Sequence, residues 1–220
     1  SGDKHDYYSF PPYWWPNPDT KDGLPYIRKD GQTNPDANSD ATDKNRLVKM
    51  SNDVSTLALA WYFTQDNRYA QKAAAQLKSW FIDPQTRMNP NLQYAQAIPG
   101  INTGRGIGII DSRALVEVVD AIALLQSSEA LNENDVSALK QWFGEYYQWM
   151  TTSQNGFEED NWHNNHGSYF DMQAATFALF SGKTDEAKQR LYITQLRRIA
   201  GQFDIEGRQM GELERTRPWH

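Results

Sequence analysis

The sequence predicts an all-α fold, an incomplete (α/α) toroid built from helical hairpins. Apolar residues recur with the helical period in six segments, and these segments follow one another in three pairs. No segment shows a convincing alternation of apolar and polar residues, which would indicate a strand. Because 220 residues lie within the ordinary range of one domain, we expect residues 1–220 to form a single toroid domain. The first helix of each pair is expected on the inside and the second on the outside.

The first pair of helices is expected at residues 50–64 and 68–81. The second of these segments is rich in alanine, and Asn67 can cap its N-terminus. The spacing of the apolar residues in the first segment, i, i+3, i+4, i+7 and i+8, places them on one side of a helix. They are Val54, Leu57, Ala58, Trp61 and Tyr62.

The second pair consists of a helix around residues 115–125 and one that starts after Asn132–Asp135. The third pair is expected at about 166–181 and 184–202. The apolar positions of these four helices are, in order, Leu115, Val118, Val119, Ile122 and Leu125; Val136, Leu139, Phe143, Tyr146 and Met150; Met172, Thr176, Phe177 and Phe180; Leu196, Ile199 and Phe203. A toroid of such pairs has its clefts at one rim, where long loops gather and carry function.

Residues 1–46 are rich in proline and glycine and are not expected to be helical, because proline fixes φ and removes a backbone donor. Loops of this length in compact domains are usually functional or disordered. The run Tyr13, Trp14 and Trp15 argues against disorder. We therefore expect a structured lid that covers a cleft, with one or more of these rings facing it. The alternative is a hydrophobic plug that ties the loop to the helical core.

The composition excludes several classes of function. The net charge of −6 argues against a nucleic-acid partner, and the absence of cysteine excludes thiolate chemistry and cysteine-based zinc sites. No apolar run is long enough to span a membrane. The 8 Trp and 11 Tyr fit an aromatic-lined cleft. We expect a monomer with no membrane partner.

Two histidines three residues apart, His163 and His166, stand in the stretch "EEDNWHNNHGSY". On a helix they could share a metal ion, with a carboxylate from residues 158–160 as the third ligand. The stretch lacks the HExxH spacing, and its asparagines favour hydrogen bonding over metal ligation. We expect no metal here.

Asn164, Asn165 and His166 stand at a predicted loop-to-helix junction. An asparagine there can cap the helix, but one cap needs only one residue. A second carboxamide beside an imidazole suits another task, in which the amide binds a carboxyl group and the histidine takes a nearby proton. The pattern leaves both interpretations open.

The segment "GELERTRPWH" carries Arg215 and Arg217. The planar guanidinium recognises carboxylates through two parallel hydrogen bonds. Glu212 and Glu214 could instead hold these arginines in structural ion pairs. Together with the Asn–His pair and the aromatic lid, the arginines point to an acidic sugar as ligand.

Three stretches resemble parts of the alginate lyase superfamily with the (α/α) toroid fold. "KHDYYSFPPYWWPNP" is similar to its lid, "NNHGSY" to its catalytic Asn–His motif, and "GELERTRPWH" to its arginine-bearing segment. The forms "NWHNNHGSYFD" and "ELERTRPWH" look closer to polysaccharide lyase family 38, which contains alginate and glucuronan lyases, than to family 5.

The resemblance implies β-elimination on a 1,4-linked polyuronate such as alginate, polymannuronate or glucuronan, without metal or cofactor. Asn165 and Arg215 would neutralise the carboxylate of the reacting sugar. His166 would be the base for one C5 epimer, or support neutralisation for the other. A tyrosine a few residues past the arginine would protonate the leaving oxygen. Residues expected to bind substrate are His5, Tyr13, Trp14, Trp15, Arg105, Trp162, His163, Tyr169 and Arg217.

The sequence ends at His220, close to the place where the resemblance puts this tyrosine. We therefore expect a fragment of a longer bacterial enzyme, truncated at both ends and inactive by itself. The longer enzyme is expected to be periplasmic or secreted, although no signal peptide is present in the sequence. Two alternatives remain: a non-catalytic protein that binds acidic polysaccharides, and an (α/α)-toroid glycoside hydrolase that uses paired carboxylates such as Glu159 and Glu212.

Overall fold

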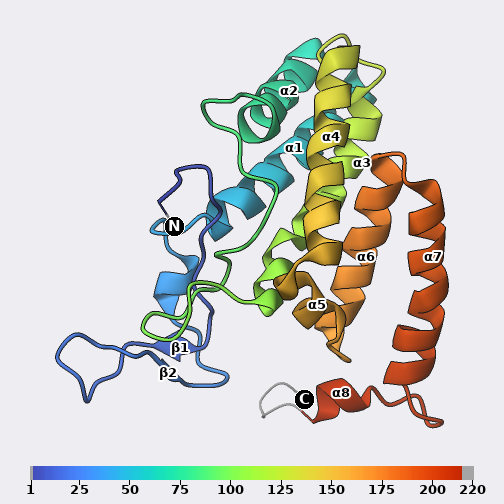
Figure 1. Ribbon diagram of the computed structural model, residues 1–220. Coiled ribbons are helices and arrows are strands. Elements are labelled where there is room, and N and C mark those ends of the chain that lie inside the picture. Colours follow the sequence, from blue (N-terminus) through green and yellow to red (C-terminus); the bar gives the residue numbers. More distant parts are fainter. Residues whose placement is uncertain (1, 215–220) are drawn as a thin grey trace.

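Three consecutive pairs of helices form the body of the protein (Figure 1). The computed structural model describes residues 2–214. The first helices of the pairs pack side by side in chain order, α1 against α3 and α3 against α6, while α2 packs on α1 and both α4 and α7 pack on α6. This confirms the predicted all-α fold, an incomplete toroid of helix pairs. The helices are α1 (Lys44–Thr64), α2 (Asn67–Phe81), α3 (Leu115–Leu125), α4 (Glu133–Thr152), α6 (Asn165–Phe180) and α7 (Thr184–Thr194).

Local capping explains where two of these helices begin. The side chains of Asn132 and Asp135 form a capping box at the start of α4, in which each accepts a backbone hydrogen bond from the other. The cap of α2 is Asp66, not Asn67, since the Asp66 carboxylate accepts from the Arg68 amide at 3.0 Å. Asn67 is the first helical residue, and its side chain accepts from the indole of Trp61. The predicted cap was therefore one residue late.

Aromatic side chains from three helices form the centre of the core. Phe81 of α2 packs on Trp142 of α4 with ring centroids 4.7 Å apart, and Phe143 of α4 packs on Phe177 of α6 at 5.1 Å. All four are buried. These contacts hold the three pairs together and give α6 a rigid base.

The last predicted helix is interrupted, and its predicted apolar face was wrong. The chain leaves α7 through a π-helical turn, η3 (Gln195–Ala200), which shifts side chains away from the period assumed for an α-helix. Leu196, Ile199 and Phe203 are therefore 58%, 62% and 44% exposed, and Arg198 is buried in their place. Two further residues predicted to face inward, Tyr62 and Met172, are also exposed.

Short elements that the sequence pattern did not predict shape the rim. The expectation of no strands was wrong for a two-stranded antiparallel ribbon in the N-terminal segment, in which Trp14 pairs with Arg28 and Trp15 with Ile27. A short helix occupies part of the stretch that was expected to be a loop before α6. These elements are β1 (Trp14–Trp15), β2 (Ile27–Arg28), η1 (Pro35–Asn38), η2 (Gly106–Ala114), α5 (Gln154–Asp160) and α8 (Met210–Leu213).

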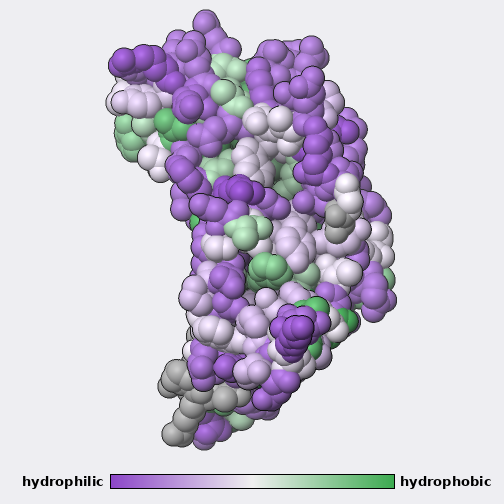
Figure 2. Space-filling model, turned by 90° about the vertical axis from the view of Figure 1, so that its left-hand side faces the viewer, coloured by the Kyte–Doolittle hydropathy of each residue, from purple (hydrophilic) through white to green (hydrophobic). Residues whose placement is uncertain are grey.

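The helices in residues 2–214 are all too short or too polar to cross a membrane. On the face of the molecule shown in Figure 2, hydrophilic residues cover most of the surface, and hydrophobic residues form small separate groups.

Candidate active site

A cleft of about 560 Å³ lies where the N-terminal segment faces η2, α5 and the start of α6. Its walls come from segments far apart in the sequence, which the toroid brings to one rim. The residues that line it are Pro12, Tyr13, Trp14, Arg28, Asp30, Lys44, Gln96, Arg105, Ile107, Ile110, Asp111, Arg113, Glu158, Trp162, Asn165 and His166.

His166 is held in one orientation at the N-terminus of α6. The side chain of Asn164 caps this helix by accepting a hydrogen bond from the His166 amide at 3.0 Å. The Nδ1 atom of the imidazole lies 2.8 Å from Oε1 of Glu159 on α5. With Nδ1 engaged, Nε2 is the ring nitrogen left for the cleft that His166 lines. An ionised Glu159 selects the tautomer with the proton on Nδ1, so that Nε2 carries the lone pair.

Glu159 is fully buried beneath the imidazole. Its Oε2 atom has no hydrogen-bond partner within residues 2–214. Burial raises the pKa of this carboxyl group above its ordinary value, and the contact with His166 opposes the rise. When the carboxylate is ionised, it stabilises an imidazolium, because the two charges lie at hydrogen-bond distance in a poorly solvated place.

The two asparagines before His166 have different surroundings. Asn164 is the helix cap, whereas Asn165 lines the cleft. The backbone amide of Asn165 donates to Oε1 of Glu212 on α8 at 2.7 Å. Glu212 thereby satisfies one of the amides exposed at the start of α6 and places a negative charge at the positive end of that helix. Neither Glu159 nor Glu212 lines the cleft: Glu159 contacts the ring of His166, and Glu212 contacts the start of α6.

Arg105 forms part of the wall between the N-terminal segment and η2. Its Nη2 donates to Oε1 of Gln96 at 2.8 Å. Partial burial lowers the pKa of this guanidinium to about 10, because the charged form has lost solvation. Gln96 is in turn oriented by the buried Asp111, which accepts from its Nε2 at 3.2 Å and from the hydroxyl of Ser9 at 2.6 Å.

Three of the predicted aromatic residues line the cleft: Tyr13, Trp14 and Trp162. The Trp162 ring lies 6.2 Å from the ring of His166. Trp15 is turned elsewhere, since its indole nitrogen donates to the Gln32 carbonyl at 2.9 Å. This follows from the β1–β2 ribbon, in which neighbouring residues point to opposite faces.

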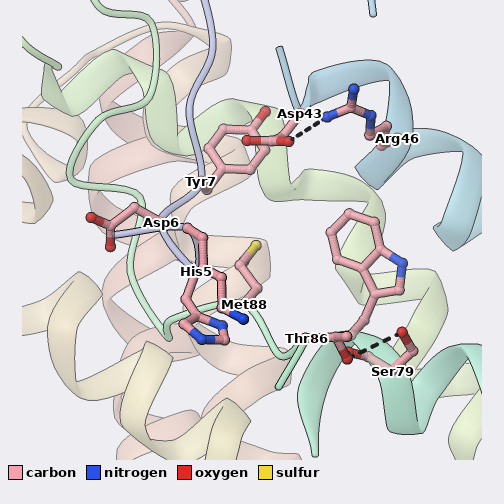
Figure 3. Close-up of a pocket in the computed structure, with 10 residues that line it drawn as sticks. His5, Asp6, Tyr7, Asp43, Arg46, Ser79, Thr86 and Met88 are labelled. Atoms are coloured by element: carbon pink, nitrogen blue, oxygen red, sulfur yellow. Dashed lines mark hydrogen bonds and ion pairs between the residues drawn. The ribbon is translucent and has the colours of Figure 1, made fainter. Parts of the chain in front are cut away.

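Several other predicted residues are not brought to this cleft. His5 is 2.6 Å from the Arg87 carbonyl through Nδ1 and lines a second pocket of about 190 Å³. Figure 3 shows His5 next to Met88 there, with the Asp43–Arg46 ion pair across from them.

His163 and Tyr169 also lie outside the cleft lining. His163 is exposed and lies 4.0 Å from Glu214. Tyr169 follows His166 on the next turn of α6, and its ring lies beneath the guanidinium of Arg113. Arg215 and Arg217 lie outside the described residues. In residues 2–214, no three His, Asp or Glu side chains gather in a way that could hold a metal ion.

A buried ion-pair network supports the loop that carries Trp162, and sequence reasoning missed it. Arg198 of η3 donates to the Trp162 carbonyl at 2.9 Å, to the carbonyl and carboxylate of Asp160, and to Asp171. A Cβ atom at Gly167 would lie 2.1 Å from the Trp162 carbonyl oxygen and 2.6 Å from Arg198. Only glycine therefore fits after His166. The one signal in the sequence was this glycine; the π-helical turn that delivers Arg198 leaves no pattern.

Comparisons with known proteins agree on one family. A family model described as "Alginate lyase" matches residues 1–220. Among solved structures, the crystal structure of an alginate lyase from Bacteroides ovatus at 1.60 Å resolution is similar, with a TM-score of 0.93 and 45% sequence identity. The match covers 97% of this chain and 56% of that chain, so the chain spans about half the length of the solved relative. Among curated proteins, none matches.

Proposed function

The chain belongs to the alginate lyase family, and we propose that it cleaves a 1,4-linked polyuronate by β-elimination, with alginate, polymannuronate and glucuronan as the candidate polymers. One observation carries the proposal. His166 and Asn165 stand side by side on a cleft that also holds cationic and aromatic side chains, and a buried carboxylate fixes the imidazole.

The reaction begins with removal of the proton on C5 of a uronate. The electron pair of the C5–H bond forms the C4=C5 double bond, the C4–O bond breaks, and the leaving glycosidic oxygen takes a proton. The C5 proton is weakly acidic because the neighbouring carboxylate is negative. Hydrogen-bond donors on that carboxylate lower the barrier by stabilising the charge that develops during proton removal.

Nε2 of His166 takes the C5 proton, and Glu159 stabilises the resulting imidazolium. The carboxamide of Asn165 donates to the substrate carboxylate, together with Arg215, which lies outside the described residues. The donor of a proton to the leaving oxygen is, by the resemblance, a tyrosine that follows this arginine.

The lining of the cleft suits an anionic sugar chain. Although the protein carries a net charge of −6, four cationic residues line the cleft against three acidic ones, so its walls are less negative than the protein as a whole. The rings of Trp14 and Trp162 provide apolar faces for the C–H sides of pyranose rings. We further propose that the protein acts as a monomer, in the periplasm or outside a bacterial cell, where such polymers are encountered; light scattering of the purified protein tests the first point.

An absorbance assay tests the proposed reaction. The form of the enzyme that includes this tyrosine is incubated with mannuronan, guluronan, glucuronan and a neutral glucan, and the near-ultraviolet absorbance of the unsaturated product is followed beside the release of reducing ends. We expect both signals from at least one uronan, neither from the glucan, and loss of both in His166→Ala. Reducing ends without absorbance would indicate hydrolysis and contradict the proposal. Binding with neither signal would indicate a polysaccharide-binding protein.

A further inference from the structure

Arg105 differs from two other arginines that are buried or partly buried in the fold. Arg198 and Arg190 both contact the carboxylates of Asp160 and Asp171. Within residues 2–214, Arg105 has no carboxylate at ion-pair distance, and its Nε atom is buried without a partner. A cation removed from water without an anion is unfavourable, so such groups are usually paired or bind a ligand.

The neighbour that orients Arg105 is neutral. Its Nη2 donates to the Gln96 carboxamide, and Asp111 accepts from the other end of that amide, which forces Oε1 toward the guanidinium. The backbone is equally constrained. A Cβ atom at Gly104 would lie 2.0 Å from the Gln93 carbonyl oxygen, and one at Gly106 would lie 2.4 Å from that of Asn155. The guanidinium of Arg105 is thus held in place, while the carboxylates that act on it, Glu158 most strongly, stay beyond ion-pair distance in residues 2–214.

We propose that Arg105 binds the carboxylate of a second uronate, adjacent to the sugar whose C5 proton His166 removes. The inference rests on the proposed function, because the repeat of a polyuronate is what supplies a second carboxylate. Asn165, with Arg215, already serves the reacting sugar. A cleft of about 560 Å³ lies within the range of sites that enclose a ligand of about disaccharide size. The planar guanidinium of Arg105 in the cleft wall can bind a carboxylate through two parallel hydrogen bonds.

Binding measured apart from turnover tests this role. Tryptophan fluorescence or calorimetry is used to titrate a His166→Ala background with a uronate tetramer and with the same tetramer after reduction of its carboxyl groups to alcohols. We expect Arg105→Met to weaken binding of the acidic tetramer about 10- to 100-fold and to leave binding of the reduced tetramer unchanged. Arg105→Lys keeps the charge but loses the planar guanidinium. Its affinity for the acidic tetramer is expected to lie between the affinities of the parent and of Arg105→Met.

A matched control removes the same unit of charge elsewhere. Arg46→Met on α1 changes an exposed arginine of the second pocket, paired with Asp43, and is expected to bind both tetramers like the parent. In the His166-containing protein, Arg105→Met is expected to raise KM for the polymer and to preserve kcat, because a neighbouring subsite contributes equally to ground-state and transition-state binding. A loss confined to kcat would overturn the assignment to a neighbouring sugar.

A stability measurement separates ligand binding from a structural role. Because no carboxylate in residues 2–214 lies at ion-pair distance from Arg105, Arg105→Met should unfold at about the same temperature as the parent when no ligand is present. A clear drop in unfolding temperature, or equal weakening of acidic and reduced tetramers, would overturn the inference. Absence of unsaturated product together with Arg105-dependent binding of the acidic tetramer would refute the lyase proposal and leave the carboxylate site standing. Failure of the parent to bind the acidic tetramer would refute the inference itself.

Discussion

Replacement of Glu159 by glutamine is expected to remove the base function of His166 without unfolding the protein. If the amide kept its oxygen toward Nδ1 of His166, its NH₂ group would occupy the position of Oε2, which has no partner in residues 2–214. Burying an unsatisfied donor there would cost about 1–3 kcal/mol. Turning the amide leaves its oxygen at that position at a similar cost, but it lets the amide donate to Nδ1 across the present 2.8 Å contact, and in either orientation the neutral amide no longer stabilises an imidazolium. The imidazole proton then moves to Nε2, and the lone pair that faces the cleft is lost.

The size of the effect follows from the role of the base. General base catalysis by a positioned side chain contributes about 10²–10⁴-fold, or about 3–5.5 kcal/mol at 1.36 kcal/mol per tenfold change in rate. We expect a loss of kcat in this range on the polymer for which His166 is the base, with KM little changed. Exchange of the C5 proton with deuterium from solvent, followed by NMR, should fall in parallel, since it reports the base step alone.

The same substitution has an expected dependence on pH. Because burial raises the pKa of Glu159 in the folded protein, the folded state keeps this proton to higher pH than the unfolded chain does. The associated stability is present below the unfolded pKa and is lost as pH rises through the folded pKa. Glutamine does not ionise, so the unfolding free energy of Glu159→Gln relative to the parent should increase from pH 4 to pH 8 in urea titrations.

Two measurements test this role of Glu159. Initial rates on mannuronan, guluronan and glucuronan are compared for the parent, Glu159→Gln and the control Glu145→Gln, an exposed carboxylate on α4 that should leave the rate unchanged. Nitrogen NMR of the His166 ring reports which nitrogen carries the proton in each. Rates within threefold of the parent on all three polymers, or a proton already on Nε2 in the parent, would refute the reasoning.

Four further outcomes are expected. Gly167→Ala, whose Cβ would meet the Trp162 carbonyl, should lower the unfolding temperature by overpacking worth about 1–3 kcal/mol and impair turnover; an unchanged temperature would contradict the close approach. Arg198→Met should lower the free energy of unfolding in urea by about 3 kcal/mol. This is the low end of the range for a broken buried ion pair, because Asp171 keeps its ion pair with Arg190. Trp14→Ala should raise KM about 3- to 10-fold with kcat kept, if its ring contributes the usual increment of an aromatic contact. Chelator treatment should leave the rate unchanged, and a loss restored by zinc would count against the metal-free mechanism.

The fold was predictable from sequence wherever the helical period was uninterrupted. The faces of α3 and α4 repeat apolar residues for several turns, so local pattern and tertiary burial agree. The prediction failed after Thr194, because a π-helical turn adds one residue to the repeat and no residue type marks it. It also failed at β1 and β2, which have only two residues each. Alternation cannot be recognised over such a length.

The candidate site was predictable to the extent that its chemistry lies in a contiguous motif. Asn165 and His166 stand next to each other and line the cleft together, and Trp14 reaches it from the N-terminal segment. Glu159 stood in the same acidic stretch as two other carboxylates, and nothing local distinguishes it. What sets it apart is its complete burial and its contact with a residue seven positions later, across the junction of α5 and α6. Arg198 could not be identified from the sequence for the same reason, because its role depends on ion pairs with Asp160 and Asp171, which lie on other elements.

The distribution of unsatisfied polar atoms adds an independent argument for where the function lies. Three buried side-chain atoms in residues 2–214 have no hydrogen-bond partner, and two of them belong to Arg105 and Glu159. Each such atom costs free energy in the unliganded protein, on the order of 1–3 kcal/mol. The third atom is the uncharged hydroxyl of Thr42, and the buried Arg198 is paired with Asp160 and Asp171. The two charged exceptions therefore stand apart. They are a cation in the wall of the cleft and an anion beneath the imidazole that lines it. A negative sugar carboxylate and a transferred proton are the two species that would compensate them, and a polyuronate undergoing elimination supplies both.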